Sequence, residues 1–207
     1  MLDLYTAGTP NGKKIPIALA ELELAYTLHV IDFSKKEQKS RAYLEINPNG
    51  KIPALVDSEG EGGERVVLFE SGAILHYLAE KTGQLLGKGA AQRAEVLSWL
   101  FWQVGGPGPM FGQAASFARE TPPNRPAYEK FLGESKRLAK VLDNRLEDRS
   151  WIAGDYSIAD IASYPWFEGI PKFEPSILDD VPHVQAWMLR MAARPAVQKG
   201  MRLGRGE

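Results

Sequence analysis

The first part of the chain alternates between the hydrophobic spacing of strands and that of helices. Short apolar or β-branched runs predict four strands, over residues 2–6, 27–33, 54–57 and 65–69. Apolar residues at i, i+3, i+4 and i+7 predict a helix after the first strand, with one face formed by Ile15, Ala18, Leu19 and Leu22. A second helix is expected over residues 71–81. Because the order is βαβ followed by ββα, we expect a small α/β domain over residues 1–82.

From about residue 90 onward, the pattern is almost entirely helical. Helices are expected over residues 91–104 and 128–147, from Ser157 onward, and over residues 182–193. The run from Gly105 to Pro109 must break or kink the first of them, because proline removes a backbone hydrogen bond and clashes with the preceding turn. We therefore expect an all-helical domain over residues 90–207, joined to the α/β domain by a linker at residues 83–89.

Composition and charge exclude several classes of function. The 207 residues are 44% hydrophobic and 25% charged, as in a soluble globular protein, and the formal net charge is −1. This charge gives no electrostatic reason to expect nucleic acid or an anionic membrane surface as a partner. No apolar run approaches the roughly 18 residues that a membrane span needs, and the N-terminus lacks the basic start of an export signal. We therefore expect a cytoplasmic protein.

The chain contains no cysteine. Disulfides, thiolate metal sites and a Cys-x-x-Cys redox pair are therefore excluded. His29, His76 and His183 follow no metal-site pattern, so no metal is expected. If the protein acts on thiols or disulfides, the reactive sulfur must arrive with a ligand.

The residues around Pro53 carry the first indication of a binding site. Pro53 opens a short apolar strand, and because proline has no N–H for a sheet ladder, it belongs at a turn, a strand start or an edge. If the Ile52–Pro53 bond is cis, the turn points the main chain of Ile52 outward, where its N–H and C=O can pair with an extended peptide. A plain junction between a turn and a strand is the alternative.

A second indication lies at the start of the following helix, at Glu70 and Ser71. Free N–H groups at a helix start bind carboxylates, while a glutamate beside them can hold an ammonium group. The alternative is an ordinary helix N-terminus, in which Glu70 only interacts favourably with the helix dipole. Together with the main chain of Ile52, these residues predict a receptor for a small zwitterionic peptide.

Three segments resemble the cytosolic glutathione transferases: Asn47–Pro53, Phe69–Ile74 and Tyr156–Ala162. They lie in both halves of the chain, in the order and at the spacing of that family. Thr9–Lys14 and Phe101–Gly106 resemble more specifically the bacterial nu class and its relatives, which include the yeast prion-type nitrogen regulator. The resemblance implies a thioredoxin-like first domain with a cis-proline and a helical second domain with the co-substrate site and dimer contacts. It also implies glutathione as the cofactor, and a homodimer.

For the reaction, the resemblance implies glutathione-dependent reduction of disulfides with two bound glutathiones, and weaker transferase or peroxidase activity. Nu-class proteins use Thr and Asn at the end of the first strand, which here correspond to Thr9 and Asn11. A hydroxyl or amide N–H that donates to the sulfur of glutathione stabilises its thiolate. Thr-Pro-Asn-Gly is also a good turn by itself. Tyr5 is a rival, because other transferase classes use a tyrosine from this strand.

The resemblance assigns the γ-glutamyl end of glutathione to Glu70 and Ser71, which hold its ammonium and its carboxylate. Ile52 and Pro53 supply the main-chain pairing with the cysteinyl segment.

Three further residues complete the expected glutathione site. Gln38 contacts the glycyl end by resemblance, with a solvated surface residue as the alternative. Lys51 reaches a carboxylate of the ligand, unless it is a solvated turn lysine. Lys130 aligns with a basic residue that reaches a ligand carboxylate across the dimer interface. A better-known relative has arginine there, and lysine makes a point contact in place of a bidentate one.

Two other functions stay open on the same fold. One is a conventional transferase that conjugates small electrophiles, with Tyr5 or Thr9 activating the thiol. The other is a non-catalytic regulatory protein that binds glutathione, although the chain lacks an Asn/Gln-rich extension. The fold alone does not separate these functions, because function depends on the site. The expected partner beside glutathione is a small disulfide or electrophile.

Overall fold

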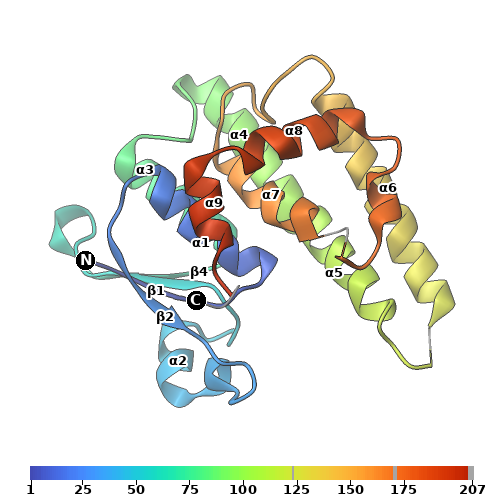
Figure 1. The fold of residues 1–207 in the computed structure, drawn as a ribbon. Coiled ribbons are helices and arrows are strands. Elements are labelled where there is room, and N and C mark those ends of the chain that lie inside the picture. Colours follow the sequence, from blue (N-terminus) through green and yellow to red (C-terminus); the bar gives the residue numbers. More distant parts are fainter. Residues whose placement is uncertain (123, 170–171, 205–207) are drawn as a thin grey trace. The chain divides into compact units, whose positions relative to one another are not determined.

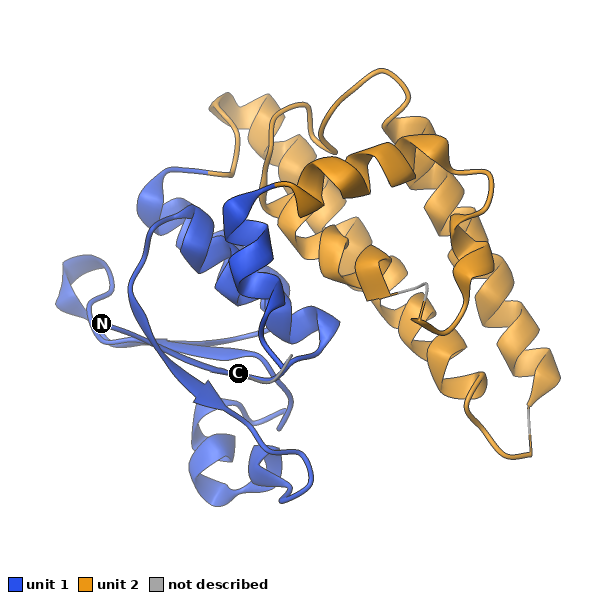
Figure 2. Cartoon of the chain, viewed as in Figure 1, with its two compact units in different colours: residues 1–84, 194–207 blue, residues 85–193 orange. Residues whose placement is uncertain are grey.

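The computed structural model describes residues 1–122, 124–169 and 172–204. The chain forms two compact units, the first with residues 1–84 and 194–207 and the second with residues 85–193 (Figure 2). Among the described residues, no helix combines the length and the apolar character needed to cross a membrane.

The first unit is built on a four-stranded sheet with the order β2-β1-β3-β4. Its strands are β1 (Leu2–Thr6), β2 (Tyr26–Val30), β3 (Ala54–Asp57) and β4 (Val66–Phe69). β1 and β2 are parallel, whereas β3 is antiparallel to both β1 and β4. This mixed sheet confirms the expected thioredoxin-like domain. The strand expected over residues 27–33 is shorter than predicted, since β2 ends at Val30.

Helices cover both faces of this sheet. They are α1 (Pro10–Glu21), α2 (Arg41–Ile46), α3 (Ser71–Thr82) and α9 (Pro195–Met201), with 3-10 turns at Glu37–Lys39 and Glu61–Gly63. In Figure 1, α1, α3 and α9 lie on one side of the sheet and α2 lies on the other. Leu4, Ile15, Leu55 and Ile74 are completely buried in its core. The sequence pattern did not predict α2, because six residues are too few for a helical period to be visible.

The last helix, α9, returns to the first unit. The guanidinium of Arg194 pairs with the carboxylate of Glu21, with an Nε···Oε1 distance of 2.7 Å. Gly200 lies against Ile17, where a side chain would have no room. The sequence pattern predicts a second domain over residues 90–207, and it did not predict that residues 194–207 belong to the first unit. A short helix after Pro195 does not indicate which domain its apolar face covers.

The second unit is all-helical, as expected. It contains α4 (Gly89–Gly105), α5 (Pro107–Phe117), α6 (Arg125–Arg145), α7 (Ile158–Gly169), the 3-10 turn Pro175–Leu178 and α8 (Pro182–Ala192). The predicted break is confirmed, since α4 ends at Gly105 and α5 begins at Pro107. Phe111, Phe167 and Trp187 are completely buried and meet edge to face in the core.

Asp160 organises the start of α7. Its carboxylate accepts hydrogen bonds from the Ser157 N–H, the Ile152 N–H and the Trp187 indole at 2.9–3.0 Å. Burial raises the pKa of Asp160 to about 6 in spite of these bonds. Because the bonds join the start of α7 to α8, Ser157 and Asp160 have a structural role.

We expect Gly200→Ala to destabilise the first unit. An added Cβ would lie 2.5 Å from the backbone nitrogen of Ile17, which cannot move aside as a flexible side chain could. Overpacking of this kind costs about 1–3 kcal/mol. Gly133→Ala in α6 is the control, because its Cβ meets no atom within 4 Å and alanine gains up to about 1 kcal/mol in a helix. Urea unfolding measures both changes, and a Gly200→Ala protein as stable as the wild type would contradict the close contact.

Candidate functional site

The register of the sheet brings several chain segments to one edge. Ala54 pairs with Tyr5 of β1 on one side and with Phe69 of β4 on the other. The start of β3 therefore lies beside the ends of β1 and β4. Since β2 is parallel to β1, it ends at the same edge. The residues that follow β1, β2 and β4 and those that precede β3 meet there.

An open pocket of about 390 Å³ lies at this edge. Its lining comes from the start of α1, the segment after β2 and the loop before β3, and consists of Thr9, Asn11, Phe33, Gln38, Lys39, Gly50, Lys51 and Ile52. Five of these are predicted site residues: Thr9, Asn11, Gln38, Lys51 and Ile52. The structure thus brings together residues that are up to 43 positions apart, from Thr9 to Ile52.

Thr9 caps the N-terminus of α1. Its hydroxyl oxygen accepts a hydrogen bond from the Gly12 N–H at 3.1 Å, so its own O–H can still donate to a group in the pocket. Gly12 is required here, because a Cβ would lie 1.9 Å from the carbonyl oxygen of Ala7. Thr-Pro-Asn-Gly is therefore not a separate turn: Thr9 is the N-cap and Pro10 to Gly12 form the first turn of α1, which places Thr9 and Asn11 at the pocket. A helix start at this position favours an anion such as a thiolate.

The loop before β3 is held from inside by its own polar groups. The Lys51 carbonyl accepts hydrogen bonds from the Asn47 amide at 2.6 Å and from the Tyr43 hydroxyl at 2.7 Å. The Ile52–Pro53 peptide bond is cis, as expected. Pro53 is buried, whereas Ile52 lines the pocket. Since the preceding carbonyl is fixed by two donors, the Ile52 peptide has a defined orientation at the pocket.

Three lining residues were not predicted: Phe33, Lys39 and Gly50. Phe33 was assigned to a strand over residues 27–33, but the strand ends at Val30 and leaves this side chain partly exposed. Gly50 has a φ of +59°, which an Asn-Gly turn pair could have indicated. Lys39 donates to the Asn49 carbonyl at 3.4 Å, a contact between segments that no local pattern reveals.

Glu70 and Ser71 form the start of α3 at the same edge, although they do not line the pocket. Glu70 is exposed, has a φ of +71° and makes no side-chain cap of the helix, so it does not act as an ordinary N-cap. Ser71 is buried, and its Oγ accepts a hydrogen bond from Lys14 Nζ at 3.2 Å. Burial lowers the pKa of Lys14 to about 7, and attraction to Glu70 opposes this shift.

Tyr5 and Lys130 are not brought into the pocket. The Tyr5 ring stacks on His29 with centroids 4.4 Å apart and packs against an apolar cluster that contains Tyr43. Lys130 is exposed on α6, in the second unit. In the described residues, acidic and histidine side chains form no group of three that could hold a metal ion.

Comparison with known proteins identifies the family. The N-terminal domain of glutathione S-transferases matches residues 9–81, and their C-terminal domain matches residues 108–195. The disulfide-bond oxidoreductase YfcG of Escherichia coli K12 is 48% identical over 204 residues, which cover 97% of this chain and 94% of YfcG. The chain belongs to the glutathione S-transferase family. The disulfide-bond oxidoreductase YghU of the same organism is 39% identical to this chain, over 96% of this chain and 73% of YghU.

Solved glutathione transferases share the whole fold. A family member from Pseudomonas fluorescens with two glutathione bound has a TM-score of 0.93 at 42% identity, over 98% of this chain and 92% of that chain. A glutathione transferase from Pseudomonas putida with one glutathione disulfide bound per subunit has a TM-score of 0.94 at 44% identity, over 97% and 90% of the two chains.

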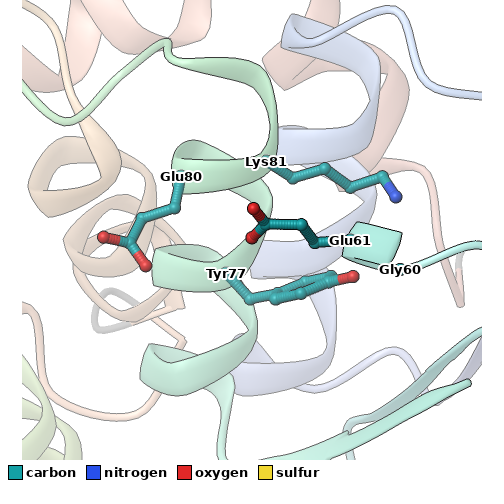
Figure 3. A pocket seen from close by; sticks show the side chains of 5 residues that line it. All are labelled: Gly60, Glu61, Tyr77, Glu80 and Lys81. Carbon is teal, nitrogen blue, oxygen red and sulfur yellow. The ribbon is translucent and has the colours of Figure 1, made fainter. Parts of the chain in front are cut away.

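A second pocket of this glutathione S-transferase, of about 680 Å³, is lined by Gly60, Glu61, Tyr77, Glu80 and Lys81 (Figure 3). The first two come from the segment between β3 and β4, and the other three from α3. Five of the predicted site residues line the other pocket, and none of them lines this one. In the second pocket, Tyr77 and Lys81 donate hydrogen bonds to a buried carboxylate, so we interpret this pocket as structural.

That carboxylate belongs to Asp57, at the end of β3. Tyr77 Oη and Lys81 Nζ donate to its Oδ2 at 2.8 and 2.7 Å, and the Glu59 N–H donates to its Oδ1 at 2.8 Å. Burial by itself raises the pKa of Asp57, but these donors outweigh it and hold the pKa below its ordinary value. The charged form of Asp57 therefore stabilises the fold.

We expect Asp57→Asn to lower the free energy of unfolding at neutral pH by about 1–3 kcal/mol, because charge-assisted hydrogen bonds are lost. The pKa of Asp57 is lower in the folded protein than in the unfolded chain, where it is about 3.9. The wild-type advantage is therefore complete above that value and disappears as the pH falls through the folded pKa. Urea unfolding at several pH values measures the difference, with the exposed Asp179→Asn as control. A difference that does not change with pH would contradict this role.

Proposed function

We propose that this glutathione S-transferase is a glutathione-dependent disulfide-bond reductase that uses two bound glutathiones, with weaker transferase and peroxidase activity. One observation carries the proposal: a chain without cysteine gathers Thr9, Asn11, Gln38, Lys51 and Ile52 around one pocket at a helix N-terminus. The names of YfcG and YghU and the glutathione or glutathione disulfide in the Pseudomonas structures support it. The protein would hold and activate a thiol that it does not itself possess.

In the proposed site, glutathione extends along the edge where the strand ends meet. Ile52 pairs through its main chain with the cysteinyl segment, next to the buried Pro53. Glu70 holds the ammonium of the γ-glutamyl end, and Ser71 with the free N–H groups of α3 holds its carboxylate.

At the other end of the ligand, Gln38 contacts the glycyl segment and Lys51 reaches a carboxylate. The buried Oε1 of Gln38 has no hydrogen-bond partner among the described residues, and an N–H of the ligand would satisfy it. Lys51 is exposed at the rim of the pocket, so its ammonium can turn toward the ligand. Lys130 is proposed to meet a carboxylate of a glutathione bound to the partner subunit.

The chemistry is two successive thiol–disulfide exchanges. The thiolate of the first glutathione attacks one sulfur of the substrate disulfide, which forms a mixed disulfide and releases one substrate thiolate that takes a proton from water. The thiolate of the second glutathione then attacks the glutathione sulfur of the mixed disulfide, which forms glutathione disulfide and releases the second substrate thiolate. Thr9 and Asn11 stabilise the attacking thiolate by donating hydrogen bonds, aided by the N-terminus of α1.

We expect Asn11→Ala and Thr9→Ala to slow the glutathione-dependent reduction of 2-hydroxyethyl disulfide by about tenfold to a hundredfold, since each loses a hydrogen bond to a charged sulfur. Thr9→Ser retains the hydroxyl and the helix cap and should stay close to the wild type. Tyr5→Phe should also have little effect, because Tyr5 stacks on His29 and does not line the pocket.

Conjugation of chlorodinitrobenzene, assayed in parallel, separates this function from a conventional transferase. The proposal requires rapid disulfide turnover with slow conjugation in the wild type. Rapid conjugation that is lost in Tyr5→Phe would contradict it and favour a conjugating enzyme. A chain that does not bind immobilised glutathione would contradict every glutathione-dependent function.

We also propose a homodimer in which the second unit supplies dimer contacts and contributes to the co-substrate site. Phe101 on α4 supports this, because 67% of this large aromatic residue is exposed in the single chain. We place the protein in the cytoplasm, where the reducing glutathione pool that this chemistry needs is maintained.

Phe101→Asp tests the dimer. A charge at this position should shift the sedimentation mass from twice that of the chain toward that of one chain, because a buried charge in an interface is costly. Leu189→Asp is the matched control, since it places the same charge at a residue that is 75% exposed on another helix, α8, and it should leave the mass unchanged. A wild type that sediments as a single chain would contradict the dimer.

A further inference from the structure

Lys14 is a buried lysine that has no part in the proposed binding of glutathione or in the proposed exchange reactions. It lies in α1 with 1% of its surface exposed, among the largest fully buried side chains of the protein. Lysine is almost never buried to this extent, because the removal of an ammonium group from water is costly unless partners compensate. One of its partners is Ser71, at an Nζ···Oγ distance of 3.2 Å. This bond joins α1 to the first residue of α3.

The bond determines what the Ser71 hydroxyl can do. When Lys14 is protonated, Ser71 Oγ accepts from its ammonium, and the hydrogen of the serine hydroxyl is directed to another acceptor. The same hydroxyl lies at the start of α3, where free backbone N–H groups and the helix dipole favour an anion. A donor that is itself bound to a cation is also a stronger donor to a carboxylate.

The charges around Lys14 favour a ligand with both signs. Glu70 lies close enough to Lys14 to oppose the effect of burial on its ionisation. If an ammonium of the ligand takes up the charge of Glu70, a carboxylate of the ligand at Ser71 becomes the new counter-charge for Lys14. A zwitterionic group satisfies Glu70, Ser71 and Lys14 together, whereas a group with an ammonium alone does not.

We infer that Lys14 is a positioning residue for the α-carboxylate of the γ-glutamyl group of glutathione, which it serves by orienting the Ser71 hydroxyl and by supplying a buried positive charge. The inference rests on the proposed function, since it takes glutathione as the ligand. According to this inference, the preference for ligands that carry this carboxylate depends on Lys14, a residue of α1 that does not line the pocket.

Calorimetric titration with two ligands tests the inference. One is glutathione, and the other is 4-aminobutyryl-cysteinyl-glycine, which has the ammonium and the rest of the peptide but lacks the α-carboxylate. We expect Lys14→Met to weaken the binding of glutathione about tenfold to a hundredfold and to leave the binding of the analogue within about twofold of the wild type. Lys14→Arg keeps the charge and should recover part of the loss.

Three controls separate this role from a purely structural one. Lys14→Gln keeps an N–H donor for Ser71 without the charge, and it replaces Lys14→Met if that protein does not fold. Lys81→Met removes another lysine of the first unit that is bonded to a buried carboxylate, and should lower stability without changing the preference for glutathione over the analogue. In a Ser71→Ala background, Lys14→Met should weaken glutathione binding less than it does in the wild type.

The outcomes are distinct. If Lys14→Met and Lys14→Gln weaken both ligands equally, or weaken neither, the inference is wrong although the wild type still binds glutathione. If the wild type itself binds no glutathione, the proposed function fails first.

Discussion

The site depends on the position of β3 between two antiparallel neighbours. Ala54 faces Tyr5 on one side and Phe69 on the other, so the loop before β3 lies beside the residues that follow β1 and β4. A shift of one residue in this pairing would exchange the two faces of the strand and disrupt the packing of the side chains on both. All four residues of β3 are buried, which makes such a shift expensive. The burial of a short strand thus fixes the arrangement of a polar site.

Two helix starts, those of α1 and α3, lie at this edge and present free N–H groups to anions. Thr9 belongs to the first and Ser71 to the second, and each hydroxyl is oriented by a neighbour, Gly12 or Lys14. A chain without cysteine can therefore offer the environment that lowers the pKa of a thiol while the thiol itself comes from the ligand. In the proposed site, the positive potential that favours an anion comes largely from the backbone N–H groups of these two helix starts.

Part of this arrangement was predictable, and the failures have physical causes. The cis bond at Pro53, the helix break before Pro107 and the gathering of Thr9 with Ile52 follow from local residue chemistry and from a family resemblance. Phe33 was missed because an apolar run does not show where a strand ends. Lys39 was missed because its contact joins two loops that are distant in the sequence.

The sequence by itself determined the strands and most helices, the absence of a protein thiol and the residue types of the site, because hydrophobic period, turn chemistry and composition are local properties. Only the tertiary structure decided which of these residues meet. The packing of α9 against α1 and the bond from Lys14 to Ser71 join residues far apart along the chain. Such contacts leave no periodic signal, since they arise when separate elements bury their apolar faces against the same sheet and carry their polar groups with them.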